Sequence, residues 1–177
     1  MNALNWMTGG AVLVCGAATY WDLRERRIPN AVTLPALALA LCLHGATQAG
    51  QGLLLSMLGA VAAGALLIPG YLLRATGAGD VKLLMAVGAF LSWPSALLAG
   101  LLSLLVGGLL GVLTALFKGR LGVVFARTFG LARWMAMRAS GAPVARPGTS
   151  GLKVPFGVAI AVATVWVAFG GPWGGVR

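Results

Sequence analysis

Acidic residues are scarce in this sequence, with only three Asp and Glu among 177 residues against thirteen Lys and Arg. Charged residues together make up 9% of the chain, and hydrophobic residues make up 59%. A soluble domain of this length has too small an interior to bury so much apolar side chain. The composition therefore excludes a soluble globular protein and predicts a membrane protein.

Potential metal ligands are also few, since the chain has two cysteines and one histidine. Cys15 and Cys42 lie in apolar runs, with no CxxC partner and no His or acid at metal-ligand spacing. We expect both to be packing residues and predict no metal site. A net charge of +10 would suggest a nucleic-acid partner in a soluble protein. In a membrane protein the charge is first explained by topology, so no nucleic acid is expected.

The apolar runs are long enough for six transmembrane helices, because about 17 to 23 apolar residues make one crossing. Gly, Pro and Asn punctuate the breaks between them. We therefore predict an all-α membrane protein, forming a single domain over residues 1–177, with spans at 3–21, 31–47, 53–73, 81–93, 95–117 and 154–170.

Positive charge is concentrated on one side of this predicted topology. Twelve of the thirteen basic residues lie between spans 1 and 2, around the start of span 4, or between spans 5 and 6, which leaves only Arg177 opposite. The positive-inside rule then makes that side cytoplasmic and both termini periplasmic. Segment 121–140 is too charged to span, and its basic residues recur at a near-helical period. We expect a basic helix there, lying in the cytoplasmic interface between the fifth and sixth spans.

Two of the three acids fall at the cytoplasmic ends of predicted spans. Asp22 follows the first span and Asp80 precedes the fourth, so residues 58 apart in sequence can meet at one depth. Two adjacent carboxylates do not easily both ionise, which is the chemistry of an aspartyl protease dyad. A structural alternative stays open for each: Asp22 can pair with Arg26 one turn later, and Asp80 can cap its helix.

Glycines precede the second of these acids in the segment Gly77-Ala78-Gly79-Asp80. Without a Cβ atom, Gly77 and Gly79 let an extended peptide backbone lie close to the carboxylate. By itself a GxGD segment is a weak signal, because glycine-rich turns are common before helices.

Several motifs together resemble the type IV prepilin peptidases, a family of bacterial intramembrane aspartyl proteases. They are Asp22 with Arg24, Arg27 and Ile28-Pro29-Asn30, then Gly77-x-Gly79-Asp80-x-Lys82-Leu83, and Pro155-Phe156-Gly157 at the start of the last span. The resemblance implies a peptidase of the bacterial inner membrane that removes the basic leader of prepilins and pseudopilins at the cytoplasmic face, after a glycine. It implies that Asp22 and Asp80 are catalytic and that no metal or cofactor takes part.

Substrate binding is a weaker prediction of the same resemblance. It assigns contacts with the prepilin to Gly77, Gly79, Lys82, Arg24, Arg27, Pro155, Phe156 and Gly157. The positive-inside rule explains the basic members of this set equally well. Membrane lipids are the other expected partner, and the sequence does not indicate an oligomeric state.

Larger members of the family insert a cytoplasmic domain with a tetracysteine metal site and methylate the new pilin N-terminus. Here nine residues separate the first two predicted spans, so methyltransferase activity is not expected, and the chain resembles the short peptidases of tight-adherence (Flp) pilus systems. Two other functions remain as alternatives. One is a small proton- or cation-coupled transporter, which would normally place its acids near mid-membrane. The other is a non-enzymatic assembly factor for a membrane machine.

Overall fold

The computed structural model describes residues 3–25, 27–72, 76–119 and 156–169, with a few isolated positions from 122 to 137. Every continuous element in these ranges is an α-helix, so the predicted all-α class is confirmed. The helices are α1 (Ala3–Glu25), α2 (Asn30–Leu72), α3 (Ala78–Leu91), α4 (Ser95–Phe117) and α6 (Phe156–Phe169).

The chain divides into two compact units, residues 1–107 with 155–177 and residues 108–154. The first unit contains α1, α2, α3, α6 and the beginning of α4, and the packing described below is that of this unit. The predicted interfacial helix at 121–140 lies mostly outside the described residues. A single domain over 1–177 stays a prediction.

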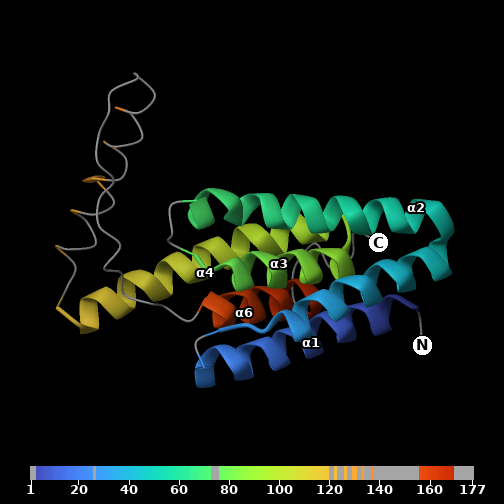
Figure 1. The fold of residues 1–177 in the computed structure, drawn as a ribbon, viewed down its shortest axis with the longest axis horizontal. Coiled ribbons are helices and arrows are strands. Elements are labelled where there is room, and N and C mark those ends of the chain that lie inside the picture. The colour runs from blue at the N-terminus through green and yellow to red at the C-terminus, as the bar shows by residue number, and fades with distance from the viewer. Residues whose placement is uncertain are drawn as a thin grey trace. The chain divides into compact units, whose positions relative to one another are not determined.

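Two predicted spans, 31–47 and 53–73, form the two arms of α2. The arms meet at Ala49, whose φ of 53° and ψ of −144° interrupt the helical conformation. The chain reverses direction there, so that the second arm runs back alongside the bundle (Figure 1). A helix break is predicted between these two spans, where the sequence reads GATQAGQG. This segment is almost entirely helical, because its Ala, Thr and Gln residues continue both arms up to that single break.

Helix boundaries differ from the predicted spans around both acids. The first span was predicted to end at residue 21, but α1 continues to Glu25. The fourth was predicted to begin at residue 81, but α3 begins at Ala78. Apolar runs end where charge begins, whereas Asp, Arg and Glu are compatible with helical backbone. Both aspartates therefore lie inside the terminal turns of helices.

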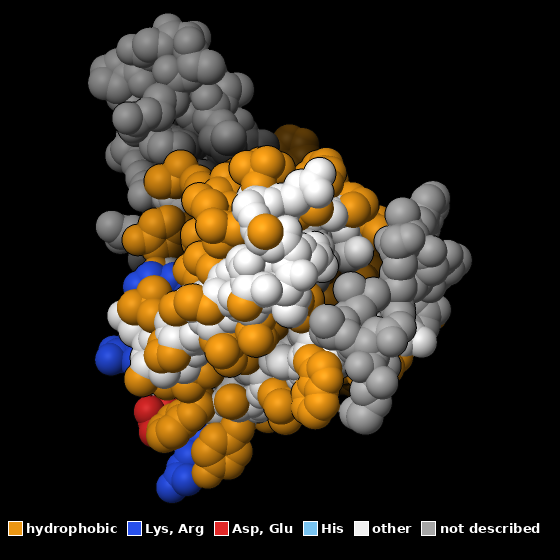
Figure 2. All heavy atoms as spheres, turned by 90° about the vertical axis from the view of Figure 1, so that its right-hand side faces the viewer, with side chains coloured by type: hydrophobic (Ala, Val, Ile, Leu, Met, Phe, Trp, Pro, Cys, Tyr) orange, Lys and Arg blue, Asp and Glu red, His pale blue; other side chains and the backbone are white. Residues whose placement is uncertain are grey.

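Within the described part of the chain, α2 and α4 are long and apolar enough to cross a membrane, and α6 is apolar but shorter. With the family evidence given below, they support a membrane protein. Six crossings remain a prediction. On the face shown in Figure 2, hydrophobic side chains are spread widely, and acidic and basic side chains appear at the lower left edge.

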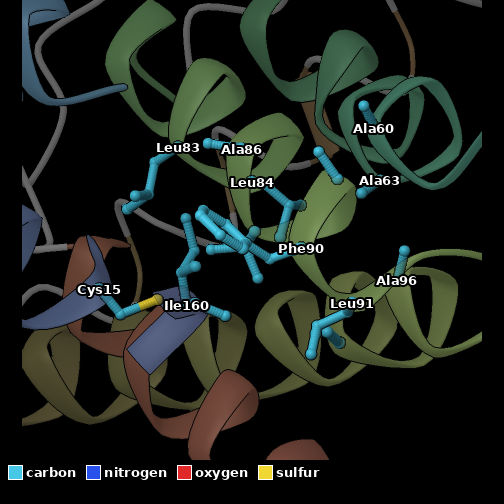
Figure 3. Packing of buried hydrophobic residues seen from close by; sticks show 14 of the residues in the cluster. Cys15, Ala60, Ala63, Leu83, Leu84, Ala86, Phe90, Leu91, Ala96 and Ile160 are labelled. Atoms are coloured by element: carbon cyan, nitrogen blue, oxygen red, sulfur yellow. The ribbon is translucent and has the colours of Figure 1, made fainter. Parts of the chain in front are cut away.

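The core is built from small and branched apolar side chains at helical spacing. On α1 the buried positions are Met7, Ala11, Cys15, Ala18 and Asp22, which form one stripe because they are three or four residues apart. In Figure 3, Cys15 of α1 lies beside Ile160 of α6, while Ala60 and Ala63 come from α2. Leu84 and Phe90 of α3 belong to the same cluster.

The central element of this unit is α3, which contacts α1, α2 and α6. Eight of its residues, from Leu83 onward, are buried, as expected for a helix that is apolar on all sides. Gly59 of α2 and Gly88 of α3 lie backbone to backbone, and a Cβ atom at Gly88 would lie 2.7 Å from Ala63 Cβ. These glycines let the two helices approach as closely as membrane helices do at small-residue contacts.

We predict that Gly88→Ala destabilises the fold by about 2 kcal/mol, because backbone atoms cannot move aside for the new methyl group. Gly16→Ala is the matched control, since nothing lies within 4 Å of a Cβ atom there. The measurement is thermal unfolding of the purified protein in detergent. Equal melting temperatures for the two variants would contradict the close approach of α2 and α3.

Candidate active site

Asp22 lies in the last full turn of α1, where it continues the buried stripe. Its side chain is 9% exposed, although it is the only charged residue on that stripe. A buried carboxylate is costly unless a hydrogen bond or a proton compensates for lost hydration. The surroundings of Asp22 therefore decide whether it can be charged.

The hydrogen-bond donor at Asp22 comes from the beginning of α6. Gly157 N–H donates to Asp22 Oδ2 at 3.0 Å. Gly157 is the second residue of α6, where the backbone N–H has no partner within its own helix and the helix dipole is positive. A Cβ atom at position 157 would lie 2.8 Å from Asp22 Oδ2, so only glycine fits without displacing the carboxylate.

A second side chain of α1 reaches the same residue of α6. Thr19 Oγ1 donates to the Gly157 carbonyl oxygen at 3.5 Å, which is a long contact. Thr19 and Asp22 are three residues apart and therefore share one face of α1. Asp22 and Thr19 thus form hydrogen bonds with both the N–H and the carbonyl group of Gly157.

Asp80 lies at the beginning of α3, in the N3 position. Its Oδ2 accepts a hydrogen bond from Gly77 N–H, at the N-cap, with a distance of 2.9 Å. This is the reciprocal bond of a capping box, in which an N3 acid satisfies the N-cap backbone. The cap predicted as a structural alternative is thus present, with Gly77 rather than Asp80 as the N-cap residue.

The two carboxyls interact electrostatically across α1 and α3. Burial raises the pKa of Asp22, and the hydrogen bond from Gly157 opposes that rise. Burial also raises the pKa of Asp80, to about 6; the bond from Gly77 lowers it, and the charge of Asp22 raises it further. Both groups lie outside the two membrane-capable helices. The arrangement favours a pair that retains a proton to a higher pH than ordinary aspartates do, and such a pair can act as a general acid and a general base.

Comparison with known proteins gives a match to one family. The sequence model of the type IV leader peptidase family matches residues 10–112, which is more than half of the chain and includes Asp22 and Asp80. The chain belongs to this family. It is therefore a leader peptidase-like protease, a hydrolase, and its apolar helices agree with a membrane location. No curated protein and no solved structure matched the chain.

The glycines of the GxGD segment have different surroundings in this peptidase. Gly77 and Ala78 are exposed, whereas Gly79 is half-buried. A Cβ atom at Gly79 would lie 3.1 Å from Ile28 Cβ and 3.3 Å from the Ile28 carbonyl oxygen. Gly79 thus packs against the segment that joins α1 and α2. Room for substrate at Gly77 and Gly79 stays a prediction.

Two of the basic residues that were predicted to contact substrate have hydrogen-bond partners within the protein. Lys82 Nζ donates to Asn30 Oδ1 at 2.9 Å, which links the beginnings of α3 and α2. Arg24 Nη1 donates to Tyr20 Oη at 2.7 Å, and its guanidinium lies 6.0 Å from the centre of that ring. Residues two apart point to different faces of a helix. Arg24 therefore lies on another face of α1 than Asp22.

The remaining predicted substrate residues are dispersed. Arg27 is exposed in the short connection between α1 and α2. Phe156 is half-buried and packs against Gly107 of α4. Pro155 lies outside the described residues, as does Arg26, the predicted partner of Asp22. Their contact with substrate stays a prediction.

Three neighbours of the site were not predicted: Thr19, Ile28 and Asn30. Thr19 could have been found, because it precedes Asp22 by three residues and so shares its helix face. Ile28 and Asn30 belong to a motif noted in the sequence, but their contacts with Gly79 and Lys82 depend on tertiary packing. Among the described residues, no three His, Cys, Asp or Glu side chains gather as a metal site would require.

We predict that Gly79→Val lowers both thermal stability and peptidase activity by more than Ala78→Leu does. The valine would press on Ile28, whereas the Ala78 side chain is exposed. Combining Gly79→Ala with Ile28→Ala should cost less stability than the sum of the single changes, because the smaller side chain lets the connection shift. Strict additivity would show that Gly79 and Ile28 do not pack together.

Proposed function

We propose that this peptidase is an intramembrane aspartic endopeptidase that removes the basic leader of type IV prepilins and pseudopilins. Cleavage follows a glycine and takes place at the cytoplasmic face of the bacterial inner membrane. The reaction uses Asp22 and Asp80 and needs no metal or cofactor. The prepilin and the surrounding lipids are its partners.

One observation carries the proposal: Asp22, at the end of α1, and Asp80, at the beginning of α3, belong to two helices that contact each other, and the matched family sequence includes both. Each lies in the terminal turn of its helix. With 14 residues, α3 is about 21 Å long at 1.5 Å per residue, which is less than a hydrocarbon core of about 30 Å. A carboxyl at the end of such a helix suits a reaction at the membrane boundary.

In the proposed hydrolysis, the two aspartates exchange protons with the water and with the peptide. The ionised carboxylate takes a proton from water while the protonated carboxyl donates a hydrogen bond to the scissile carbonyl oxygen. Water oxygen then forms a bond to the carbonyl carbon. The carbon–nitrogen bond breaks as the leaving amine receives a proton from the dyad, and a peptide carboxyl and a free amine result. The pair ends with one proton, as it began.

Substrate approaches the pair from the exposed side of the GxGD segment. Gly77 and Ala78 have no covering side chain among the described residues, so an extended peptide can lie along this backbone. Lys82 and Arg27 supply positive charge nearby, which suits an acidic residue in the mature part of a pilin. In this proposal Lys82 exchanges its bond with Asn30 for one with the substrate.

Methyltransferase activity is not part of the proposal. Helix α1 ends at Glu25 and α2 begins at Asn30, so four residues connect them. Such a connection has no room for the additional cytoplasmic domain of the larger family members.

We expect Asp22→Asn and Asp80→Asn each to abolish leader cleavage, because the amide keeps the shape of the carboxyl but cannot transfer a proton. Glu25→Gln is the matched control on the exposed end of α1 and should cleave normally. Processing is followed by the gel shift of a co-expressed prepilin, with peptidase levels measured in membranes. Normal processing by both Asp variants would rule out the dyad.

Membrane orientation has a separate test. A reporter fused after Gly148 should be cytoplasmic and one fused after Arg177 periplasmic, because twelve of the thirteen basic residues lie on the first side. Paired enzymatic reporters, each active on one side only, give the measurement. A periplasmic result at Gly148 would invert the topology and place both aspartates away from the proposed leader.

A further inference from the structure

The beginning of α6 contacts the carboxylate of Asp22, although α6 lies outside the residues that the family model matches. The matched segment ends at residue 112, whereas Gly157 donates its N–H to Asp22 Oδ2. The sequence suggested substrate binding for Gly157. Its position suggests another role, because the residue is buried and its N–H is already engaged.

Each aspartate has one oxygen bound to a helix N-terminus. Asp22 Oδ2 accepts from the second residue of α6, and Asp80 Oδ2 accepts from the N-cap of α3. Among the described residues, neither Oδ1 atom accepts a hydrogen bond. The two Oδ1 atoms are therefore the ones available to share a proton and to act on water.

The two N–H donors differ in how far they lie, along the chain, from the aspartate that they bind. The donor to Asp80 belongs to the same helix, three residues away, so local helix geometry maintains it. The donor to Asp22 is 135 residues away in sequence and depends on how α6 packs against α1. Thr19 contributes to that packing through the carbonyl of the same glycine.

We propose that the N-terminus of α6 is the positioning element of the catalytic pair, with Gly157 and Thr19 as positioning residues. The hydrogen bond from Gly157 N–H to Oδ2 orients the Asp22 carboxyl so that Oδ1 is free to react. Thr19 in turn fixes the Gly157 peptide by donating a hydrogen bond to the Gly157 carbonyl oxygen. The absence of a Cβ atom at 157 is required because that atom would lie 2.8 Å from Asp22 Oδ2, closer than van der Waals contact permits. This inference rests on the proposed leader cleavage.

The expected signature is a loss of turnover rather than of substrate binding. A displaced carboxylate still permits the peptide to bind, but it no longer meets the reacting atoms. Gly157→Ala should lower kcat about 100-fold, since a displacement near 1 Å can have such an effect, while KM changes little. Thr19→Val should lower kcat about threefold, as for a single neutral hydrogen bond, and Thr19→Ser should restore it.

The pH profile gives a second signature, which a purely structural role would not produce. The hydrogen bond from Gly157 lowers the pKa of Asp22. Without it the pKa rises, so the acidic limb of the kcat/KM profile should move to higher pH. Asp80 on α3 is the charged group that acts on Asp22. The other ionisable groups on the packed elements are Lys82 of α3, Cys42, His44 and Tyr71 of α2, and Cys15, Tyr20, Arg24 and Glu25 of α1; α6 has none.

The experiment uses the full-length protein in detergent and a synthetic peptide with a basic leader, a glycine and an apolar segment. Thr164→Val is the matched control, because Thr164 joins α1 and α6 through Cys15 in the same interface, away from Asp22. It should keep wild-type kcat and pH profile. If Gly157→Ala reaches the membrane and keeps kcat within about twofold of wild type, the inference is overturned.

If Gly157→Ala does not fold, the two Thr19 variants test the positioning role instead. Equal kcat values and equal pH profiles for Thr19→Val and Thr19→Ser would then reject the positioning role. Failure of the proposed function looks different, since wild-type protein would then not cleave the peptide at all. Loss of kcat in Thr164→Val equal to that in Thr19→Val would also reject the inference, because any weakening of the α1–α6 interface would then suffice.

Discussion

Burial of α3 on all sides is the constraint on which the rest of the described bundle depends. A helix that is apolar all round has to be enclosed, and α1, both arms of α2 and α6 provide the enclosure. The close approach at Gly59 and Gly88 is possible because neither residue has a side chain. Since α3 is short, its first turn stays near the end of the bundle, where Asp80 meets the end of α1.

The candidate site arises from opposing effects on the same two carboxyls. Burial favours their neutral forms, and the N–H groups at the beginnings of α6 and α3 favour their charged forms. The charge of Asp22 adds to the rise in the pKa of Asp80. The raised pKa values extend to higher pH the range in which the pair holds a proton, and a shared proton is what general acid and base catalysis requires. Structural capping and catalysis are therefore compatible roles for Asp80.

Much of the fold could be predicted from hydrophobic run length. The predicted span at 95–117 coincides with α4, and the two spans at 31–47 and 53–73 correspond to the arms of α2. Hydropathy could not locate the ends of α1 and α3, because charged residues end an apolar run without ending a helix. It also could not show that the reversal in α2 takes place at Ala49 alone, since this depends on backbone conformation rather than polarity.

The sequence by itself determined the helical class, the membrane character, the family and the two candidate aspartates, because these depend on composition and on motifs that stay local in the chain. Only the tertiary structure decided which groups surround them. It placed Gly157 on Asp22, Ile28 on Gly79 and Asn30 on Lys82. Each of these contacts joins separate elements, and the packing of whole helices sets their distances. No local pattern contains that information.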